Sequence, residues 1–509
     1  MKLPRILAFA LLLASCAQGP APAVRTDLRN PILPGFHPDP SVCRVGDDYY
    51  IVNSSFQYFP GVPVYHSTDL QNWELIGNVL DRESQLPLEK SGSWNGIYAT
   101  TIRYNDGVFY MITTNVTVGK NFYVTATDPA GPWSEPIWLE QGGIDPSFYF
   151  EDGKCYFVSN PDGQITLCEI DPATGRQLTA SKAIWGGTGG RFPEGPHIYR
   201  KDGWYYLLIS EGGTELAHGL TIARSRRIYG PYKACPSNPI FTHCRQAAQG
   251  HQIQGTGHGD FVQAADGSWW VVFLAYRNFG GSYHHLGRET FIAPVSWEKG
   301  WPVVNGGQPV EVFTGERKKV ARHFDFAEGF GPDWLFIQNP DTSRYAVENG
   351  SLVLHGGRPL VENDHPVFVG IRQESEVMEF ETGVSLRSDG EAGISVYQIH
   401  DGHFDLAVRR RYGKQEAVAL CTLKSLQTEL ASVPLRSASA RLKVVADAEM
   451  YHLYVSDDSG ASWKHLYSVN CSLLSTEVAG GFTGVVMGLY SVEAEAGFDD
   501  ITSLSLLPV

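Results

Sequence analysis

The chain has 509 residues, a formal net charge of −15 and an aromatic content of 12%, with 54 glycines. This length favours two domains over a single core, and the combination of aromatics with glycine favours short strands joined by tight turns. No long run of Lys or Arg is present. Together with the negative charge, this excludes nucleic acid as an expected partner and argues against binding to an anionic membrane surface.

The first residues have the features of an export signal. Lys2 and Arg5 precede an apolar run over residues 6–14 that is too short to span a bilayer permanently. Small residues then lead to Cys16 in a pattern that resembles a bacterial lipobox. We therefore expect a lipoprotein signal peptide over residues 1–16 and a flexible tether over residues 17–27. Lipidated Cys16 would anchor an exported protein to a bacterial membrane, in the periplasm or at the cell surface; an ordinary signal peptide with an incidental cysteine is the alternative.

Seven cysteines follow Cys16, so at least one of them is unpaired within the chain. Export permits disulfides. Cys155 and Cys168 could bridge neighbouring strands, and Cys235 and Cys244 could close a loop. No Cys-x-x-Cys motif or Cys/His cluster indicates zinc.

A short pattern recurs five times in the first part of the chain: a turn, an aromatic pair and an apolar run. The copies occupy residues 46–52, 106–112, 152–158, 202–208 and 266–272. Asp-Gly between strand-like segments indicates a β-hairpin, and a spacing of about 45 to 65 residues accommodates a four-stranded sheet per copy. The repeat predicts a five-bladed β-propeller over residues 28–320; unrelated hairpins in a β-sandwich are the alternative.

The remaining part of the chain, residues 321–509, lacks this repeat. Alternating strand-like segments, such as residues 350–355 and 451–455, are separated by turn signals about every ten residues. This pattern predicts a second domain with a β-sandwich fold of the jelly-roll type. The expected fold class is therefore all-β, a five-bladed β-propeller followed by a β-sandwich.

The repeat also predicts where functional side chains meet. About eleven or twelve residues before the second aromatic of each copy, the chain should lie on the preceding strand, the innermost of its blade. These positions hold Asp39, a residue near Tyr98, Asp145, Glu194 and His258. Because the innermost strands of a propeller line its central channel, we expect these side chains to converge at one end of the channel.

Three carboxylates around a narrow channel suit the hydrolysis of a glycosidic bond. That reaction needs a protonated acid at the leaving oxygen and a carboxylate on the opposite face, and a third charge can separate their pKa values. Prolines flank each acid, in His-Pro-Asp-Pro-Ser at residues 37–41, Ile-Asp-Pro-Ser at residues 144–147 and Pro-Glu-Gly-Pro-His at residues 193–197. Their rigidity would limit side-chain movement, although each motif taken alone could be a simple turn.

Residues 30–41, 143–147 and 194–199 resemble the signatures of glycoside hydrolase family 43, which contains β-xylosidases and α-L-arabinofuranosidases. The resemblance extends from about residue 30 to the end of the chain. It implies a five-bladed propeller, an inverting single-displacement mechanism and no required cofactor. It also implies that Asp39 is the general base, that Glu194 is the general acid, and that Asp145 raises the pKa of the acid and orients it.

Further positions match the family pattern. Arg288 resembles the arginine that contacts the sugar in the −1 subsite, and Phe56 and Tyr98 match aromatics that pack against the sugar ring. His258 resembles a channel histidine that holds a calcium ion or a water in some members; a buried histidine without metal is the alternative. The best-known xylosidases carry Trp at the position of Tyr98, so the preference for xylose or arabinose stays open.

The C-terminal half resembles the concanavalin-like sandwich of the xylosidase branch, in which a loop narrows the pocket. Phe482, in Gly-Phe-Thr-Gly at residues 481–484, is the expected contributor. The sequence thus predicts an exo-acting enzyme that releases terminal xylose, arabinose or both from xylo-oligosaccharides or arabinoxylan. A debranching α-L-arabinofuranosidase is the alternative. A retaining fructan-cleaving propeller would need an Asn-Asp-Pro-Asn-Gly-like motif, which this sequence lacks, and a sugar-binding lipoprotein without activity would not need three intact acids.

Overall fold

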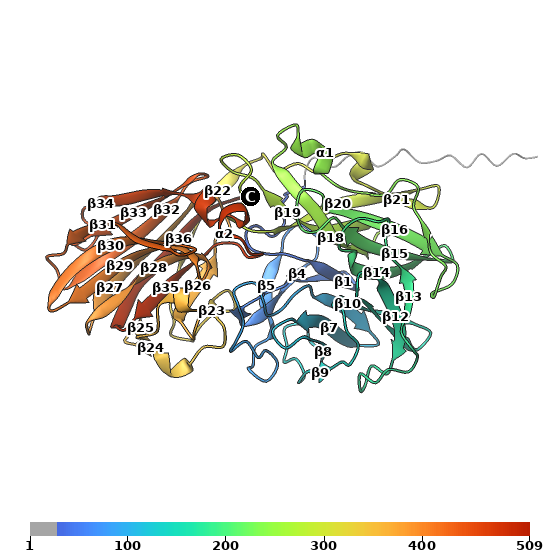
Figure 1. Cartoon of the computed structure of the whole chain (residues 1–509), viewed down its shortest axis with the longest axis horizontal. Coiled ribbons are helices and arrows are strands. Elements are labelled where there is room, and N and C mark those ends of the chain that lie inside the picture. Colours follow the sequence, from blue (N-terminus) through green and yellow to red (C-terminus); the bar gives the residue numbers. More distant parts are fainter. Residues whose placement is uncertain (1–27, 509) are drawn as a thin grey trace, which may run out of the picture.

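The computed structural model describes residues 28–508, which form two domains built almost entirely of β-strands (Figure 1). The expected signal peptide, Cys16 and the tether lie outside the described residues. Five four-stranded sheets form the first domain, and two eight-stranded sheets form the second. The prediction of a five-bladed β-propeller followed by a β-sandwich is confirmed.

Each blade of the propeller is one antiparallel sheet whose strands follow one another along the chain. The five blades are formed by β1 (Ser41–Val45), β2 (Asp48–Val52), β4 (Gly61–Ser67) and β5 (Glu74–Leu80); β6 (Thr101–Asn105), β7 (Val108–Asn115), β8 (Lys120–Ala126) and β9 (Ile137–Trp138); β10 (Ile144–Glu151), β11 (Lys154–Asn160), β12 (Ile165–Ile170) and β13 (Lys182–Trp185); β14 (Glu194–Lys201), β15 (Trp204–Glu211), β16 (Gly219–Ser225) and β17 (Lys233–Ala234); and β18 (Ile253–Gln263), β19 (Trp269–Arg277), β20 (Glu289–Glu298) and β21 (Trp301–Val304).

Each copy of the repeat forms the hairpin between the first two strands of a blade. In the second, third and fourth blades both turn residues have positive φ, for example 50° at Asp152 and 72° at Gly153. A type I′ turn requires this conformation, and Asp-Gly adopts it readily. The aromatic and apolar residues that follow are largely buried, for example Phe157 and Leu207, so each copy supplies both the turn and part of the core.

Buried polar side chains tie the first strands of four blades together. The Arg103 guanidinium on β6 forms an ion pair with Asp260 on β18, with an Nη1–Oδ2 distance of 2.7 Å. Asp260 also accepts hydrogen bonds from Ser41 of β1, at 2.6 Å, and from Tyr199 of β14, at 2.5 Å. Burial alone would raise the pKa of Asp260, but Arg103, His197 and Ser41 hold it well below its ordinary value. The strands that carry the site are thereby fixed relative to one another.

The sandwich domain packs two sheets face to face around one large hydrophobic core. One sheet contains, in spatial order, β24 (Tyr345–Glu348), β25 (Ser351–His355), β36 (Glu495–Pro508), β27 (Met378–Leu386), β32 (Ser439–Ala446), β33 (Met450–Ser456) and β34 (Lys464–Asn470), and β22 (Arg317–His323) pairs with β36. The other contains β3 (Tyr58–Phe59), β23 (Leu335–Ile337), β26 (Val367–Arg372), β35 (Val486–Val492), β28 (Gly390–Ile399), β29 (Gly402–Arg411), β30 (Lys414–Leu423) and β31 (Leu426–Pro434).

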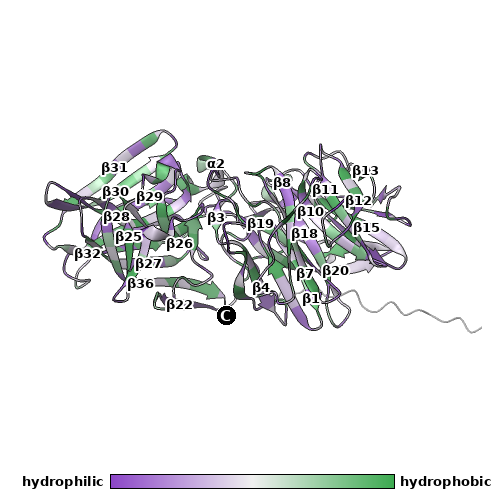
Figure 2. Ribbon diagram, turned by 90° about the horizontal axis from the view of Figure 1, so that it is seen from below, coloured by the Kyte–Doolittle hydropathy of each residue, from purple (hydrophilic) through white to green (hydrophobic). Residues whose placement is uncertain are grey.

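The two domains lie side by side and share hydrogen-bonded structure at their junction (Figure 2). Strand β3 belongs by sequence to the first blade, yet it pairs with β23 at the edge of the sandwich sheet. A second connection joins the loop at His285 to Val485, whose backbone N–H donates to the His285 carbonyl at 3.0 Å. Nearby, a side chain at Gly287 would lie 2.7 Å from the backbone of Gly484, so only glycine allows this close approach.

Helical structure is minor in the described part of the chain. It consists of the α-helical turns α1 (Cys244–Ala247) and α2 (Thr476–Ala479) and the 3₁₀ turns η1 (Asn305–Gly307), η2 (Thr342–Arg344), η3 (Leu360–Glu362) and η4 (Cys471–Leu474). Between residues 28 and 508, none of these helices has the length and apolar character to cross a membrane. All seven cysteines after Cys16 are free, so the bridges considered for Cys155–Cys168 and Cys235–Cys244 are absent from the structure. Cys155 and Cys168 lie on the adjacent strands β11 and β12 but face different partners in the ladder.

Candidate active site

A pocket of about 190 Å³ lies where the first strands of the blades meet the sandwich. This volume is below the roughly 300–1,000 Å³ of sites for drug-sized ligands, so it suits a single sugar unit. The pocket is lined by Asp39, Phe56, Tyr98, Ala99, Ile144, Asp145, Phe192, Glu194, Gly213, Thr214, Glu215, His258, Arg288 and Phe482. The structure therefore brings together all eight site residues expected within the described part of the chain.

Asp145 and Glu194 stand at irregularities of the β-ladder, and Asp39 lies just before the start of β1. Asp39 and Asp145 have φ values of 51° and 52°, and Gly195, which follows Glu194, has a φ of 59°. The pairing register shifts between Ile144 and Ser147 on β10 and between Glu194 and His197 on β14. Such bulges re-aim side chains, and they tolerate the prolines after each acid because the interrupted ladder needs no N–H there.

Asp39 is buried, with 5% of its surface exposed, and its carboxylate is held on both oxygens. Arg288 Nη1 donates to Oδ1 at 2.8 Å, and the Ser54 hydroxyl donates to Oδ2 at 2.5 Å. His258 Nδ1 lies 4.0 Å from Oδ1. Burial alone would raise the pKa of Asp39, but Arg288, His258 and Ser54 together hold that pKa below its ordinary value. Asp39 is therefore an ionised carboxylate in a fixed orientation.

Asp145 lies in the opposite electrostatic environment. Burial, the nearby Glu194 carboxylate and Asp39 raise the pKa of Asp145 well above its ordinary value. The backbone N–H of Gly195 donates to Asp145 Oδ2 at 3.3 Å, which links Asp145 to the bulge that carries Glu194. Because two neighbouring carboxyl groups resist double ionisation, Asp145 takes up a proton more readily than a separate carboxylate would.

Glu194 faces His218, a residue that the sequence analysis did not identify. His218 is fully buried, and its Nε2 lies 3.6 Å from Glu194 Oε1. His218 Nδ1 donates to the Gly255 carbonyl at 3.0 Å, and a side chain at Gly257 would collide with its ring. The imidazole therefore stands in one orientation beside the carboxyl group of Glu194.

His258 lies on β18 with a φ of 47°, at another irregularity of the ladder. Its backbone N–H donates to the Ser210 hydroxyl at 2.6 Å, and its ring covers Gly195, where an added Cβ would lie 3.0 Å from it. Burial lowers the pKa of His258. Between residues 28 and 508 no three His, Cys, Asp or Glu side chains are grouped to hold a metal ion, so calcium at His258 stays a prediction.

Aromatic rings form the wall of the pocket opposite the acids. The ring centroids of Phe56 and Tyr98 are 5.3 Å apart, and those of Phe56 and Phe482 are 6.2 Å apart in a stacked arrangement. The Arg288 guanidinium lies 5.5 Å from the Phe56 ring and 5.7 Å from the Phe482 ring. Phe482 comes from the sandwich, so the second domain completes the pocket that the propeller begins.

Other pocket residues gave no recognisable signal in the sequence. Phe192 is 60% exposed at the pocket, and the Arg191 guanidinium lies 5.1 Å from its ring. Arg191 also pairs with Glu215 at 3.3 Å, and the Thr214 hydroxyl accepts from Arg288 at 3.3 Å. These residues and His218 lie outside the positions that the repeat aligns, which is why register alone does not find them. Phe192 could have been noticed because it stands two residues before Glu194.

Comparison with known proteins agrees with this arrangement. The pattern "Glycosyl hydrolases family 43" matches residues 28–302, and the pattern "Beta xylosidase C-terminal Concanavalin A-like domain" matches residues 322–500. A non-reducing end alpha-L-arabinofuranosidase of Bacteroides ovatus is 41% identical over 91% of both chains. A xylosidase/arabinosidase of Butyrivibrio fibrisolvens is also 41% identical, over 91% of this chain and 95% of its own.

Solved structures show the same two-domain arrangement. The protein described as Bacteroides ovatus Xyloglucan PUL GH43B has a TM-score of 0.87 at 39% identity, covering 94% of this chain and all of that one. A xylan beta-1,4-xylosidase from Bacillus halodurans has a TM-score of 0.86 at 34% identity, with the same coverage. With its catalytic-domain pattern, its second domain and relatives aligned over nearly their full length, this chain belongs to family 43 of the glycosyl hydrolases and is an exo-acting glycoside hydrolase.

Proposed function

We propose that this enzyme releases terminal xylose, arabinose or both from xylo-oligosaccharides or arabinoxylan, with inversion at the anomeric carbon. The observation that carries the proposal is the meeting of Asp39, Asp145 and Glu194 in one small pocket closed by aromatic rings. A pocket of about 190 Å³ is small enough to suit one terminal sugar. The two most similar relatives described above are named for arabinofuranosidase and xylosidase/arabinosidase activity, which supports a pentose in this pocket.

Asp39 is the proposed general base. Its lowered pKa keeps it ionised, and a carboxylate is the form that can take a proton from an attacking water. Arg288 and Ser54 hold its oxygens, so the water would be activated in one direction relative to the sugar. Arg288 stands between Asp39 and the aromatic wall, where its remaining N–H groups can orient sugar hydroxyls.

Glu194 is the proposed general acid, which donates a proton to the leaving oxygen. Asp145 is the proposed positioning residue. It accepts a hydrogen bond from the Gly195 backbone, next to Glu194, and the carboxyl groups of Asp145 and Glu194 repel each other when both are ionised. His218 supports the same carboxyl group from the other side. Departure of the leaving group past Phe192 and Glu215 fits their place at the pocket. The mechanism uses no cofactor and does not require calcium at His258.

The export and anchoring of the enzyme are part of the proposal. Lys2, Arg5, the apolar segment over residues 6–14 and Cys16 support a bacterial lipoprotein held at a membrane, in the periplasm or at the cell surface. Metabolic labelling with a tritiated fatty acid tests this: the native chain should incorporate label, and the Cys16→Ala variant should not. Equal labelling of both chains would contradict anchoring through Cys16.

The choice between the two pentoses depends on kinetics. We expect activity on both aryl β-D-xylopyranoside and aryl α-L-arabinofuranoside, measured as kcat/KM with Glu194→Ala as the blank. A tenfold preference corresponds to about 1.4 kcal/mol of differential transition-state binding. Dominance of the arabinofuranoside would favour the debranching alternative and would point to Tyr98. Activity on neither substrate, in a folded protein, would contradict the proposal and favour the binding-only alternative.

A further inference from the structure

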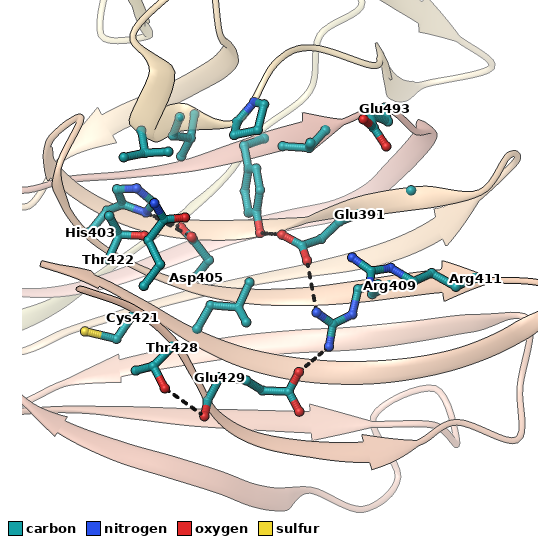
Figure 3. Close-up of a pocket in the computed structure, with 18 of the residues that line it drawn as sticks. Glu391, His403, Asp405, Arg409, Arg411, Cys421, Thr422, Thr428, Glu429 and Glu493 are labelled. Atoms are coloured by element: carbon teal, nitrogen blue, oxygen red, sulfur yellow. Dashed lines mark hydrogen bonds and ion pairs between the residues drawn. The ribbon is translucent and has the colours of Figure 1, made fainter. Parts of the chain in front are cut away.

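A second, larger cavity lies away from the pocket, on the outer face of the sandwich. It encloses about 800 Å³, roughly four times the volume of the pocket, and shares no lining residue with it. It is lined by residues of β28, β29, β30, β31 and β35 and by the segment around Leu360. Figure 3 shows side chains that line it. We call this cavity the sandwich groove.

Regular alternation places polar side chains on the floor of the sandwich groove. His403, Asp405, Arg409 and Arg411 are separated by even numbers of residues on β29, so they share one face of the sheet (Figure 3). Glu429 reaches the same face from β31.

Several of these groups are buried and rigid. Asp405, with 4% of its surface exposed, accepts from His403 Nδ1 at 3.0 and 2.9 Å. The Tyr490 hydroxyl donates to Glu391 at 2.7 Å. His403 is itself almost fully buried, and its Nε2 has no hydrogen-bond partner among the described residues. An unpaired buried nitrogen is costly unless a ligand or water satisfies it.

The charges of the sandwich groove largely compensate one another. Arg409 forms ion pairs with Glu391 and Glu429, and Arg410 pairs with Asp389 at 3.2 Å. No uncompensated cluster of one sign remains to attract a polyanion or a polycation. Carboxylate, guanidinium and amide groups in fixed positions are suited to the neighbouring hydroxyl groups of a neutral sugar.

An aromatic ring is available beside these polar groups. Tyr412 lines the groove at the turn that follows β29, and 98% of its surface is exposed. Because the ring is almost fully exposed, its burial adds no stability to the fold, and its face is free to pack against a sugar ring. The volume of about 800 Å³ admits several sugar units.

From these observations we propose that the sandwich groove is a second, non-catalytic binding site for a neutral oligosaccharide of several xylan-type units. It would hold a chain on the sandwich while the pocket removes terminal sugars. The choice of a xylan-type chain rests on the proposed function; the existence of a sugar site rests on the groove itself. A longer ligand gains from a second contact because the two sites act at a high effective concentration.

The test measures xylohexaose binding by calorimetry in full-length protein carrying Asp39→Asn, which prevents hydrolysis. Adding Tyr412→Ala and Glu429→Gln together should weaken xylohexaose binding at the sandwich groove, seen as one of two binding components, at least tenfold. Adding Phe482→Ala, which alters the pocket, should leave that component unchanged. Tyr467→Ala, which removes a partly exposed tyrosine from β34 in the other sheet, is the matched control and should have no effect.

The folding of the groove variant is checked separately. With Asp39 intact, the Tyr412→Ala/Glu429→Gln enzyme should keep its kcat/KM on an aryl glycoside within about twofold, because that substrate fills only the pocket. Xylohexaose binding that is equal in parent and groove variant, or that disappears with Phe482→Ala alone, would overturn the proposal. Failure of the proposed function is a different result: activity on neither aryl glycoside, whatever the groove binds.

Discussion

The pocket and the sandwich groove are both built on β-sheet, yet in opposite ways. The pocket gathers residues that lie between positions 39 and 482 of the chain, and Asp145 and Glu194 stand at breaks in the ladder. The groove uses consecutive hairpins over β28–β31, and its polar residues on β29 alternate in regular register. Breaks aim single side chains into a small pocket, whereas alternation displays a row of side chains along a larger groove. A small pocket suits bond cleavage at one sugar, and a larger groove suits holding a chain.

The largest effect should come from removing the base of the pocket. We expect Asp39→Asn to reduce kcat by about 10³-fold or more on every substrate, since it removes the carboxylate that is held ionised to take the proton from water. Rates on xylo-oligosaccharide and on aryl glycosides measure it. A variant that keeps more than a tenth of its activity on either substrate would contradict the assignment of Asp39.

Glu194→Gln should have an effect that depends on the leaving group. A sugar leaving group needs the proton, so we expect a loss of about 10²–10⁴-fold on xylobiose. An aryl glycoside with a good leaving group needs no proton and should retain much of its rate. Equal losses on both substrates would argue that Glu194 is not the acid. In the same assays, NMR of the first product should show inverted configuration, and retention would overturn the single-displacement mechanism.

Phe482→Ala tests the contribution of the sandwich to the pocket. Loss of one buried aromatic contact is worth about 1.5–3 kcal/mol, so we expect kcat/KM on aryl glycosides to fall about tenfold or more. The pH dependence should not change, since Phe482 is not charged. A shifted pH profile would mean that the substitution disturbs Arg288, whose guanidinium also contacts the Phe482 carbonyl at 3.4 Å.

The smallest expected effect is on stability and has opposite signs for two acids. The lowered pKa of Asp39 means that its charge stabilises the fold above its unfolded-state pKa, and this contribution is lost as pH falls through the folded-state pKa. The raised pKa of Asp145 means the reverse, so its ionisation destabilises the fold as pH rises. At pH 7, Asp39→Asn should lower Tm by a few degrees, at about 2–4 °C per kcal/mol.

Asp145→Asn should instead raise Tm at pH 7, and the gain should shrink as pH falls toward 4. Thermal unfolding followed by circular dichroism across this pH range measures both variants. A decrease of Tm in Asp145→Asn at all pH values would contradict the unfavourable burial of its charge. The comparison shows that an active site can carry a charge that the fold alone would not keep.

The repeat in the sequence predicted the five blades because each copy carries its own turn and core residues. It also predicted that Asp39, Asp145, Glu194 and His258 converge, since equivalent positions of the blades meet at the channel. His218 was not predicted, because it lies directly before β16 and outside the positions that the repeat aligns. Tertiary packing decides which loops reach the pocket, and no local sequence pattern predicts these contacts.

The sandwich groove was also invisible in the sequence. Arg409 and Arg411 belong to a run of three arginines, and a run of charged residues on a strand predicts exposure and not a cavity. Only the folded curvature of β28–β31 and the segment at Leu360 create the enclosed space. The disulfides considered from cysteine spacing are also absent from the structure. Cys155 and Cys168 lie on the consecutive strands β11 and β12, but the register of this pair places Cys155 opposite Ile170 and Cys168 opposite Phe157.

The exchange of β3 has a consequence for how such enzymes can evolve. An uncovered β23 would present unpaired backbone groups at the rim of its sheet, the kind of rim that invites aggregation. The propeller supplies the covering strand from a loop that also carries Phe56. A sandwich transferred by gene shuffling without its propeller would lose β3 and expose the edge of β23. A propeller without its sandwich would lose the strand that supports the loop carrying Phe56. The two domains are therefore expected to be inherited together, as one module and not as two.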